Sequence, residues 1–173
     1  MKLRFERLSV AVALCWLVYL AVGGQSMQQG QFVAFEAAGL MAEPPEAVTR
    51  VTLASQEARR VLEPVPGGGW TVDARPISAA TAPRVALAVK FLHTARPLRE
   101  LGKADQDPAY GFADPGALRV EVERAGKPAL VLVLGKPGSE ATTQYVAEER
   151  RGRAWLMSRF VGEEWEAVWA GVR

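Results

Sequence analysis

Short runs in which apolar and polar residues alternate dominate the chain from residue 47 onwards. Such alternation is typical of β-strands with one buried and one solvated face. In residues 49–53, for example, Thr49, Val51 and Leu53 are expected to share one face. A continuous apolar run at 129–134 instead predicts a central strand that is buried on both faces. The remaining predicted strands are 61–65, 70–72, 97–102, 118–123, 145–147 and 154–158.

Glycine and proline separate these runs and predict tight turns. The Pro-Gly-Gly-Gly segment at 66–69 lies between two predicted strands. Glycine accepts positive φ without steric cost, so we expect a β-hairpin here. The alternative, a phosphate-binding glycine loop, requires a following Lys-Ser/Thr pair and a helix, and the sequence has neither at this place.

Two segments have helical instead of alternating periodicity. Residues 81–93 repeat apolar side chains at helical spacing, with Thr81 as a candidate N-cap. Residues 165–172 repeat the same spacing and include Trp165 and Trp169, so both indoles are expected to be buried. The sequence therefore predicts an α+β domain, in which a mostly antiparallel β-sheet carries an internal helix and a C-terminal amphipathic helix.

The N-terminus has a different pattern. Residues 8–24 carry no charge, and Lys2, Arg4 and Arg7 precede them. This length is near the lower limit for a helix that crosses a bilayer, and the preceding cations favour a cytoplasmic N-terminus. We expect residues 1–24 to be a transmembrane signal anchor. The alternative is a cleaved signal peptide, which the small residues near position 23 would permit.

Residues 25–46 are expected to link this anchor to an exported domain at 47–173. The linker contains an apolar patch at 32–41, which ends before two prolines because proline cannot continue a helix. One interpretation is a short helix that packs on the domain or continues the anchor. The other is a docking site for a partner. The candidate partner-binding residues are Phe32, Phe35 and Leu40, together with Trp165 and Trp169.

Charge and composition exclude several classes of function. The net charge is +2, and residues 1–7 supply all of it with three cations and one anion. The rest of the chain is neutral, so it offers no basic surplus for nucleic acid. One Cys and one His exclude a Cys/His metal cluster and an internal disulfide.

Three polar features remain as candidates. His93 ends the predicted internal helix, where histidine more often stabilises the helix C-terminus than performs chemistry. Asp105 and Asp107 begin a calcium-loop pattern but lack its downstream Gly and Glu, so a solvated loop is the favoured interpretation over a calcium site. The arginines at 150–153, offset by two glutamates, predict a solvated turn, with an anionic partner as the alternative.

Several short motifs follow one another along the chain: residues 69–72, the helix at 82–93, Tyr110-Gly111-Phe112 with Pro115, and residues 118–122, 132–136 and 145–146. On these motifs, residues 47–160 resemble the bacterial family called domain of unknown function 4340. The resemblance implies a single-pass inner-membrane protein with an exported, periplasmic, β-rich region. Some members of that family lie beside components of ABC-type transport or gliding systems, and the resemblance implies no catalytic residues.

We therefore expect a membrane-anchored, extracytoplasmic accessory or assembly subunit without catalytic activity. Residues 8–24 would hold it in the membrane, and its partners would be other integral membrane or envelope proteins. We expect no cofactor, no metal and no nucleic acid. The alternatives are a periplasmic module that binds a small ligand or lipid, and a hydrolase that uses carboxylates such as Asp105, Asp107 and Asp114.

Overall fold

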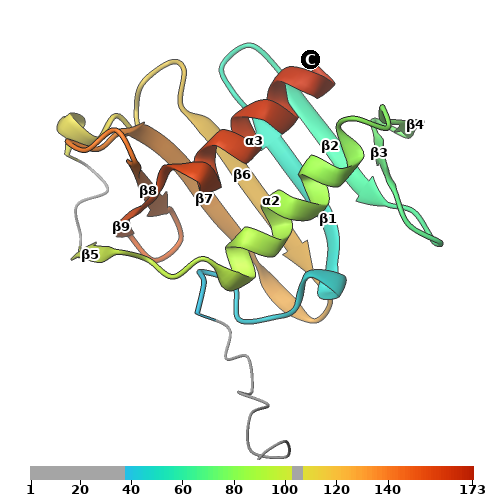
Figure 1. Cartoon of the computed structure of the whole chain (residues 1–173), viewed down its shortest axis with the longest axis horizontal. Helices are drawn as coiled ribbons and strands as arrows, with labels where there is room; N and C mark the ends of the chain where they lie inside the picture. The colour runs from blue at the N-terminus through green and yellow to red at the C-terminus, as the bar shows by residue number, and fades with distance from the viewer. Residues whose placement is uncertain (1–37, 103–106) are drawn as a thin grey trace, which may run out of the picture. The chain divides into compact units, whose positions relative to one another are not determined.

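The computed structural model describes residues 38–102 and 107–173. Two helices, Ala82–Thr94 (α2) and Arg159–Val172 (α3), lie side by side across one face of an antiparallel sheet (Figure 1). The strands are Val48–Ala54 (β1), Arg59–Pro64 (β2), Trp70–Val72 (β3), Arg75–Pro76 (β4), Arg99–Gly102 (β5), Leu118–Arg124 (β6), Lys127–Pro137 (β7), Thr143–Glu148 (β8) and Arg153–Ser158 (β9). Their order in the sheet is β4-β3-β2-β1-β6-β7-β8-β9-β5. The predicted α+β class, with a mostly antiparallel sheet and two helices, is confirmed.

The core lies between the helices and the sheet. The predicted stripe of α2 is buried as a unit, because Val85, Ala88, Val89 and Leu92 all face the strands. In α3, Trp165 is 0% exposed and Trp169 is 6% exposed, and both belong to the same apolar cluster. The core interpretation of the C-terminal stripe is confirmed.

Strand β1 departs from the simple alternation expected at 49–53. A β-bulge lies between Val48 and Arg50, where the pairing with β6 shifts register. The extra residue moves Thr49 to an exposed position, whereas Val51 and Leu53 are buried. The prediction that Thr49 shares a face with Val51 and Leu53 was wrong, because a bulge inserts one residue into a strict two-residue period.

Residues 38–46, expected to be linker, pack on the domain. The backbone amide of Gly39 donates to the His93 carbonyl at 3.0 Å, and that of Met41 donates to the Leu92 carbonyl at 2.8 Å. The Met41 side chain is 0% exposed. The domain therefore begins before residue 47, and the predicted boundary was wrong. The reason is that backbone hydrogen bonds to the end of α2 hold this segment, in which the 3-10 helix Pro45–Ala47 (η1) precedes β1.

The expected anchor cannot be placed. No helix in the described part of the chain is long and apolar enough to cross a membrane. The predicted span at 8–24 lies outside the described residues, as do Phe32 and Phe35. The anchor therefore stays a prediction from the sequence.

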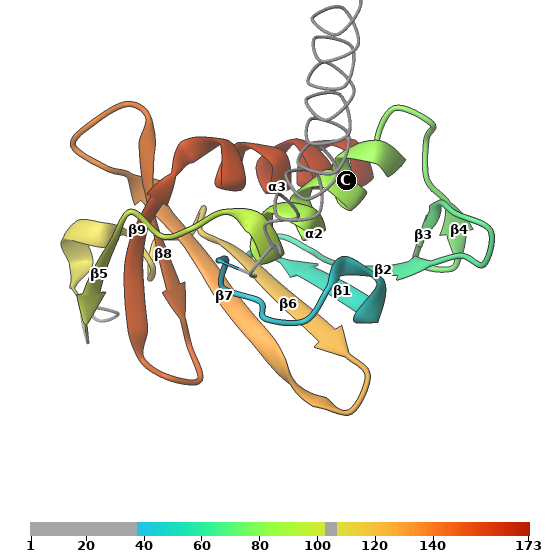
Figure 2. The ribbon, with the colours of Figure 1, turned by 60° about the horizontal axis from the view of Figure 1, so that its bottom comes forward.

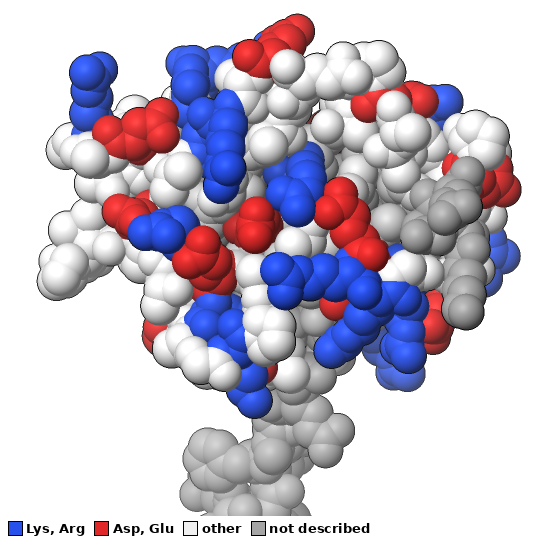
Figure 3. Space-filling model, turned by 180° about the vertical axis from the view of Figure 1, so that it is seen from behind, with Lys and Arg blue, Asp and Glu red and all other residues white. Residues whose placement is uncertain are grey.

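Charged side chains cover the face of the sheet opposite the helices, as Figure 3 shows. Arg50 of β1 lies 2.8 Å from Glu63 of β2 and 3.4 Å from Glu123 of β6. Hydrogen bonding to Glu63 and the charge of Glu123 raise the pKa of the Arg50 guanidinium. Arg119 of β6 lies 3.0 Å from Glu149, which directly follows β8. Opposite charges from different strands thus pair with one another on this face.

Candidate functional site

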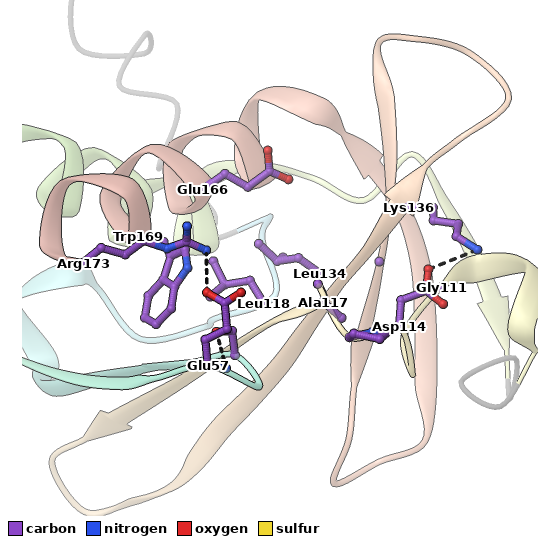
Figure 4. A pocket seen from close by; sticks show the side chains of 14 residues that line it. Glu57, Gly111, Asp114, Ala117, Leu118, Leu134, Lys136, Glu166, Trp169 and Arg173 are labelled. Atoms are coloured by element: carbon purple, nitrogen blue, oxygen red, sulfur yellow. Dashed lines mark hydrogen bonds and ion pairs between the residues drawn. The ribbon is translucent and has the colours of Figure 1, made fainter.

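A recess of about 430 Å³ lies where β6 begins and β7 approaches its end, under the C-terminal half of α3 (Figure 4). Leu118 and Leu134 of the two strands and Trp169 of the helix supply its apolar lining. Its volume is within the range of small-molecule sites. The charged side chains that line it are Glu57, Asp114, Lys136, Glu166 and Arg173.

Four of the five charged side chains of this recess form ion pairs with one another. Lys136 Nζ lies 3.1 Å from the Asp114 carboxylate, and Arg173 lies 3.6 Å from the Glu57 carboxylate. The Arg173 guanidinium also lies over the Trp169 ring, 5.6 Å from its centroid. Three of these four charged side chains are more than half exposed, so such pairs are weak in water and can open to admit a ligand. The arrangement offers a mixed-charge binding surface and does not aim two carboxylates at one point.

A buried polar side chain contacts two residues of the recess lining. Gln144 is 2% exposed, and its amide nitrogen donates to the Gly135 carbonyl at 2.9 Å and to Glu166 at 3.2 Å. Its Oε1 atom is buried without a hydrogen-bond partner in the described structure. Gly162 of α3 makes room for this amide, because a Cβ at position 162 would overlap it. Gln144 therefore positions Glu166 at the edge of the recess.

The Tyr-Gly-Phe motif folds over the sheet next to the recess. Residues Pro108–Tyr110 form a short 3-10 helix, which Gly111 ends with a φ of 73°. The Tyr110 ring lies 4.4 Å from the Tyr145 ring and 5.9 Å from the Phe112 ring, between centroids. A Cβ at Gly135 of β7 would overlap the Tyr110 carbonyl and come within 2.8 Å of the Phe112 ring. The motif is thus a packed turn, as its aromatic residues and glycine predict.

The candidate partner-binding residues do not come together as one surface. Leu40 is half-buried and packs against the core cluster. Trp165 and Trp169 belong to that cluster. Phe32 and Phe35 lie outside the described residues, so their role stays a prediction. Among the described candidates, the structure favours packing over partner binding.

The polar candidates have local partners. The Nδ1 atom of His93 lies 3.1 Å from the Met41 carbonyl oxygen, which ties the end of α2 to the segment before β1. Asp107 caps the 3-10 helix through a hydrogen bond of 2.9 Å from the Ala109 amide. Within residues 38–102 and 107–173, no group of three or more His, Cys, Asp or Glu side chains could hold a metal ion. Asp105 lies outside these ranges.

Neither Gln144 nor Glu166 stands out in the sequence as a site residue. Gln144 precedes the predicted strand at 145–147, and Glu166 is one of several glutamates in the last helix. Only the pairing of β8 with β9, which places Gln144 opposite Met157 on the helix-covered face, shows that its amide is buried. A polar residue at the end of an apolar strand was the single signal available.

Comparison with protein-family models, with curated proteins and with solved structures finds no match to this chain. The resemblance to the domain of unknown function 4340 family stays a prediction from the sequence motifs.

Proposed function

We propose that this protein is a single-pass, membrane-anchored accessory or assembly subunit whose folded domain lies outside the cytoplasm and has no catalytic role. The uncharged run at 8–24, with Lys2, Arg4 and Arg7 before it, supports the anchor and its orientation. The observation that carries the assembly role is an apolar surface on the two helices, next to the place where the N-terminal chain joins the domain.

This helix-pair surface consists of Leu87, Phe91 and Phe160. Leu87 is 37% exposed and Phe160 is 45% exposed. The Phe91 ring packs edge-on against the Phe160 ring, with 4.7 Å between their centroids. Leu87 and Phe91 are four residues apart on α2 and therefore lie on the same side of the helix. Aromatic residues that remain accessible on a folded domain are enriched in protein interfaces.

The helix-pair surface is also close to the chain that leads to the expected anchor. The hydrogen bonds of residues 39 and 41 go to the carbonyls of Leu92 and His93, which directly follow Phe91. From residue 24 to residue 38 the chain can span at most about 50 Å when fully extended. A retained anchor would therefore hold residue 38 no more than about 50 Å from the membrane, a distance at which a partner with its own folded domain can contact the helix-pair surface.

The experiment measures the size of the native complex. Full-length protein is extracted from its own membrane in a mild detergent and separated by native electrophoresis. We expect the wild type to migrate in a complex larger than the detergent-bound monomer, and Phe160→Glu to release the monomer. Val65→Glu is the matched control, because Val65 is 40% exposed and follows β2, which four strands of the sheet separate from β9 and the start of α3.

Three results would contradict the proposal. The assembly role would be contradicted if the wild type migrated as a monomer. It would also be contradicted if the two glutamate variants migrated in complexes of the same size. Release of the wild type from membranes by alkaline carbonate would contradict the predicted anchor, because a transmembrane helix stays in the membrane under that treatment whereas a peripheral protein is released.

A further inference from the structure

Two hairpin turns of the sheet meet at a hollow that is rich in cations. The β6–β7 turn and the β8–β9 turn project to the same side of the domain (Figure 2). Between them lies a hollow of about 320 Å³. The ionisable side chains that line it are Arg124, Lys127, Arg150 and Arg151, with Glu43 and Glu148 as the only acids in its lining among the described residues. Four cations against two carboxylates leave a surplus of two positive charges.

The acids of the hairpin-tip hollow engage two of its cations. Arg124 pairs with Glu43 at 2.6 Å, and Arg151 pairs with Glu148 at 3.5 Å. Lys127 and Arg150 are exposed. Neither of them forms an ion pair or a side-chain hydrogen bond with another described residue, and the charge of Lys127 acts on Glu43 only from a longer distance, where it helps to lower the pKa of that carboxyl. These two side chains are therefore available to an anion that approaches the hollow from outside.

The interior of the hollow is polar as well as positive. The Arg124 side chain is 11% exposed, and one of its terminal nitrogens donates to the Pro128 carbonyl. Its Nε atom is buried and has no hydrogen-bond partner in the described structure. Arginine side chains present several N–H donors in a plane, which suits the oxygens of a phosphate group. The hollow thus combines a fixed guanidinium with two exposed cations at its rim.

The hollow lies close to the chain that leads to the expected anchor. Glu43 belongs to the segment that packs against the end of α2 and then continues to the β6–β7 turn, where the Ala125 amide donates to the Ala47 carbonyl at 3.2 Å. Glu43 is five residues after residue 38, so the hollow is within about 17 Å of the first described residue. The attraction of a cation to a charged membrane fades within about 10 Å, so the hollow meets headgroups only when the domain lies against the bilayer, a position that the tether to the expected anchor permits.

We propose that the hairpin-tip hollow binds the phosphate headgroups of anionic lipids in the membrane that holds the protein. The inference rests on the proposed function, because the anchor at residues 8–24 is what brings the hollow to the bilayer. Lys127 and Arg150 contact headgroups at the rim, and the Arg124 guanidinium stabilises a phosphate that enters the hollow. The domain then lies on the membrane in one orientation, with the two hairpin turns toward the lipid.

The test uses the full chain reconstituted into vesicles. The one natural cysteine is replaced (Cys15→Ser), and a cysteine is introduced at Ala125 in the β6–β7 turn. A membrane-impermeant donor dye labels the outward-facing molecules, and the vesicles carry an acceptor on their headgroups. A second preparation has the cysteine at Ser139, in the β7–β8 loop at the opposite end of β7. Energy transfer reports the distance of each label from the membrane surface.

We expect transfer from position 125 to be higher in vesicles that contain phosphatidylglycerol than in phosphatidylcholine alone, and to fall as salt is added. Transfer from position 139 should not rise. Lys127→Glu with Arg150→Glu should abolish the difference, since each cation near an anionic surface is worth about fivefold in binding. Arg59→Glu with Arg75→Glu changes the net charge equally, on residues of β2 and β4 that form no ion pair with a described residue, and should have no effect.

Three results would overturn the inference. The first is equal transfer in neutral and anionic vesicles. The second is an equal loss in the two double variants, which would reflect net charge alone. The third is inorganic phosphate binding that Lys127→Glu with Arg150→Glu weakens while the transfer in anionic vesicles stays unchanged, which would indicate a site for free phosphate. Vesicle flotation after alkaline carbonate reads the anchor separately. If the chain leaves the vesicles, the proposed function is contradicted. The lipid-dependent energy transfer measured before that treatment still tests whether the hollow binds anionic headgroups.

Discussion

Gly135 of β7 lies directly against the backbone carbonyl of Tyr110, in a space that no side chain can share. The contact joins the Tyr-Gly-Phe turn to a central strand although the two residues are distant in the sequence. The Tyr110 ring extends the contact to Tyr145 on the next strand, 4.4 Å away between centroids. The turn is therefore held on the sheet by a backbone contact and by an aromatic contact.

The first prediction follows from this relationship. Gly135→Ala should lower the free energy of unfolding by about 1–3 kcal/mol, because the added methyl group must displace a backbone carbonyl and an aromatic ring. Gly116→Ala is the control, because a Cβ at that position meets no atom within 4 Å. Denaturant unfolding of both variants measures the difference. Equal stabilities would show that the turn moves away from the sheet at little cost.

Much of the fold could be predicted from periodicity. The stripe of α2 and the two-sided burial of β7 follow from spacing alone, because each residue in them faces the side that its hydropathy predicts. The strand at 49–53 was only partly predictable. Its bulge at Thr49 depends on the pairing with β6, and a periodic pattern carries no information about a register shift.

The site was less predictable than the fold. The lining of the recess comes from elements that are far apart in the chain, such as Glu57 after β1 and Glu166 on α3. The attachment of residues 39 and 41 to the end of α2 uses backbone atoms, which side-chain patterns do not report. The helix-pair surface likewise depends on the contact of Phe91 with Phe160, which follows from the packing of two helices.

The second prediction concerns the tryptophans of α3. Trp165→Ala should cost about 3–5 kcal/mol of stability, because it removes a fully buried indole from the core. That is a large fraction of the roughly 5–15 kcal/mol that stabilises a typical domain. Phe160→Ala, at a site that is 45% exposed, should change stability by less than about 1 kcal/mol. Thermal melting compares the two, and an unchanged melting temperature for Trp165→Ala would contradict its place in the core.

The third prediction concerns the acidic loop. Asp107→Asn keeps an oxygen that can accept the hydrogen bond of the Ala109 amide, so it should change stability by less than about 1 kcal/mol. Asp107→Ala removes the acceptor and should cost about 0.5–2 kcal/mol, as in other helix caps. Calcium should leave the melting temperature unchanged. A calcium-dependent rise that Asp105→Asn with Asp107→Asn removes would instead indicate a metal site.

The fourth prediction concerns the N-terminus. If residues 8–24 are a retained anchor, the intact mass of protein extracted from the membrane should correspond to a chain that starts at Met1 or Lys2. A mature protein that starts at Gly24 would identify the segment as a cleaved signal peptide. The measurement separates these two interpretations because the mass difference includes the whole apolar run.

The last prediction concerns the pH dependence of stability through Glu43. A hydrogen bond from its own backbone amide, together with the Arg124 guanidinium, lowers the pKa of the Glu43 carboxyl below its usual value of 4.5. The folded state therefore binds this proton more weakly than the unfolded state does. As the pH falls, the unfolded state takes up the proton first, so the stabilisation is complete above pH 4.5 and is lost as the pH passes through the lowered pKa.

Glu43→Gln removes this titration and leaves the Arg124 guanidinium, only 11% exposed, without its carboxylate. The variant should be less stable than the wild type by about 1–3 kcal/mol at neutral pH, because a largely buried charge loses its partner. The difference should shrink below pH 4.5 as the wild-type carboxyl becomes neutral. Glu46→Gln, three residues further on and without an ion pair to a described residue, is the control. Melting temperatures measured across this pH range decide the matter, since a difference that does not depend on pH would assign the Glu43 effect to packing and not to charge.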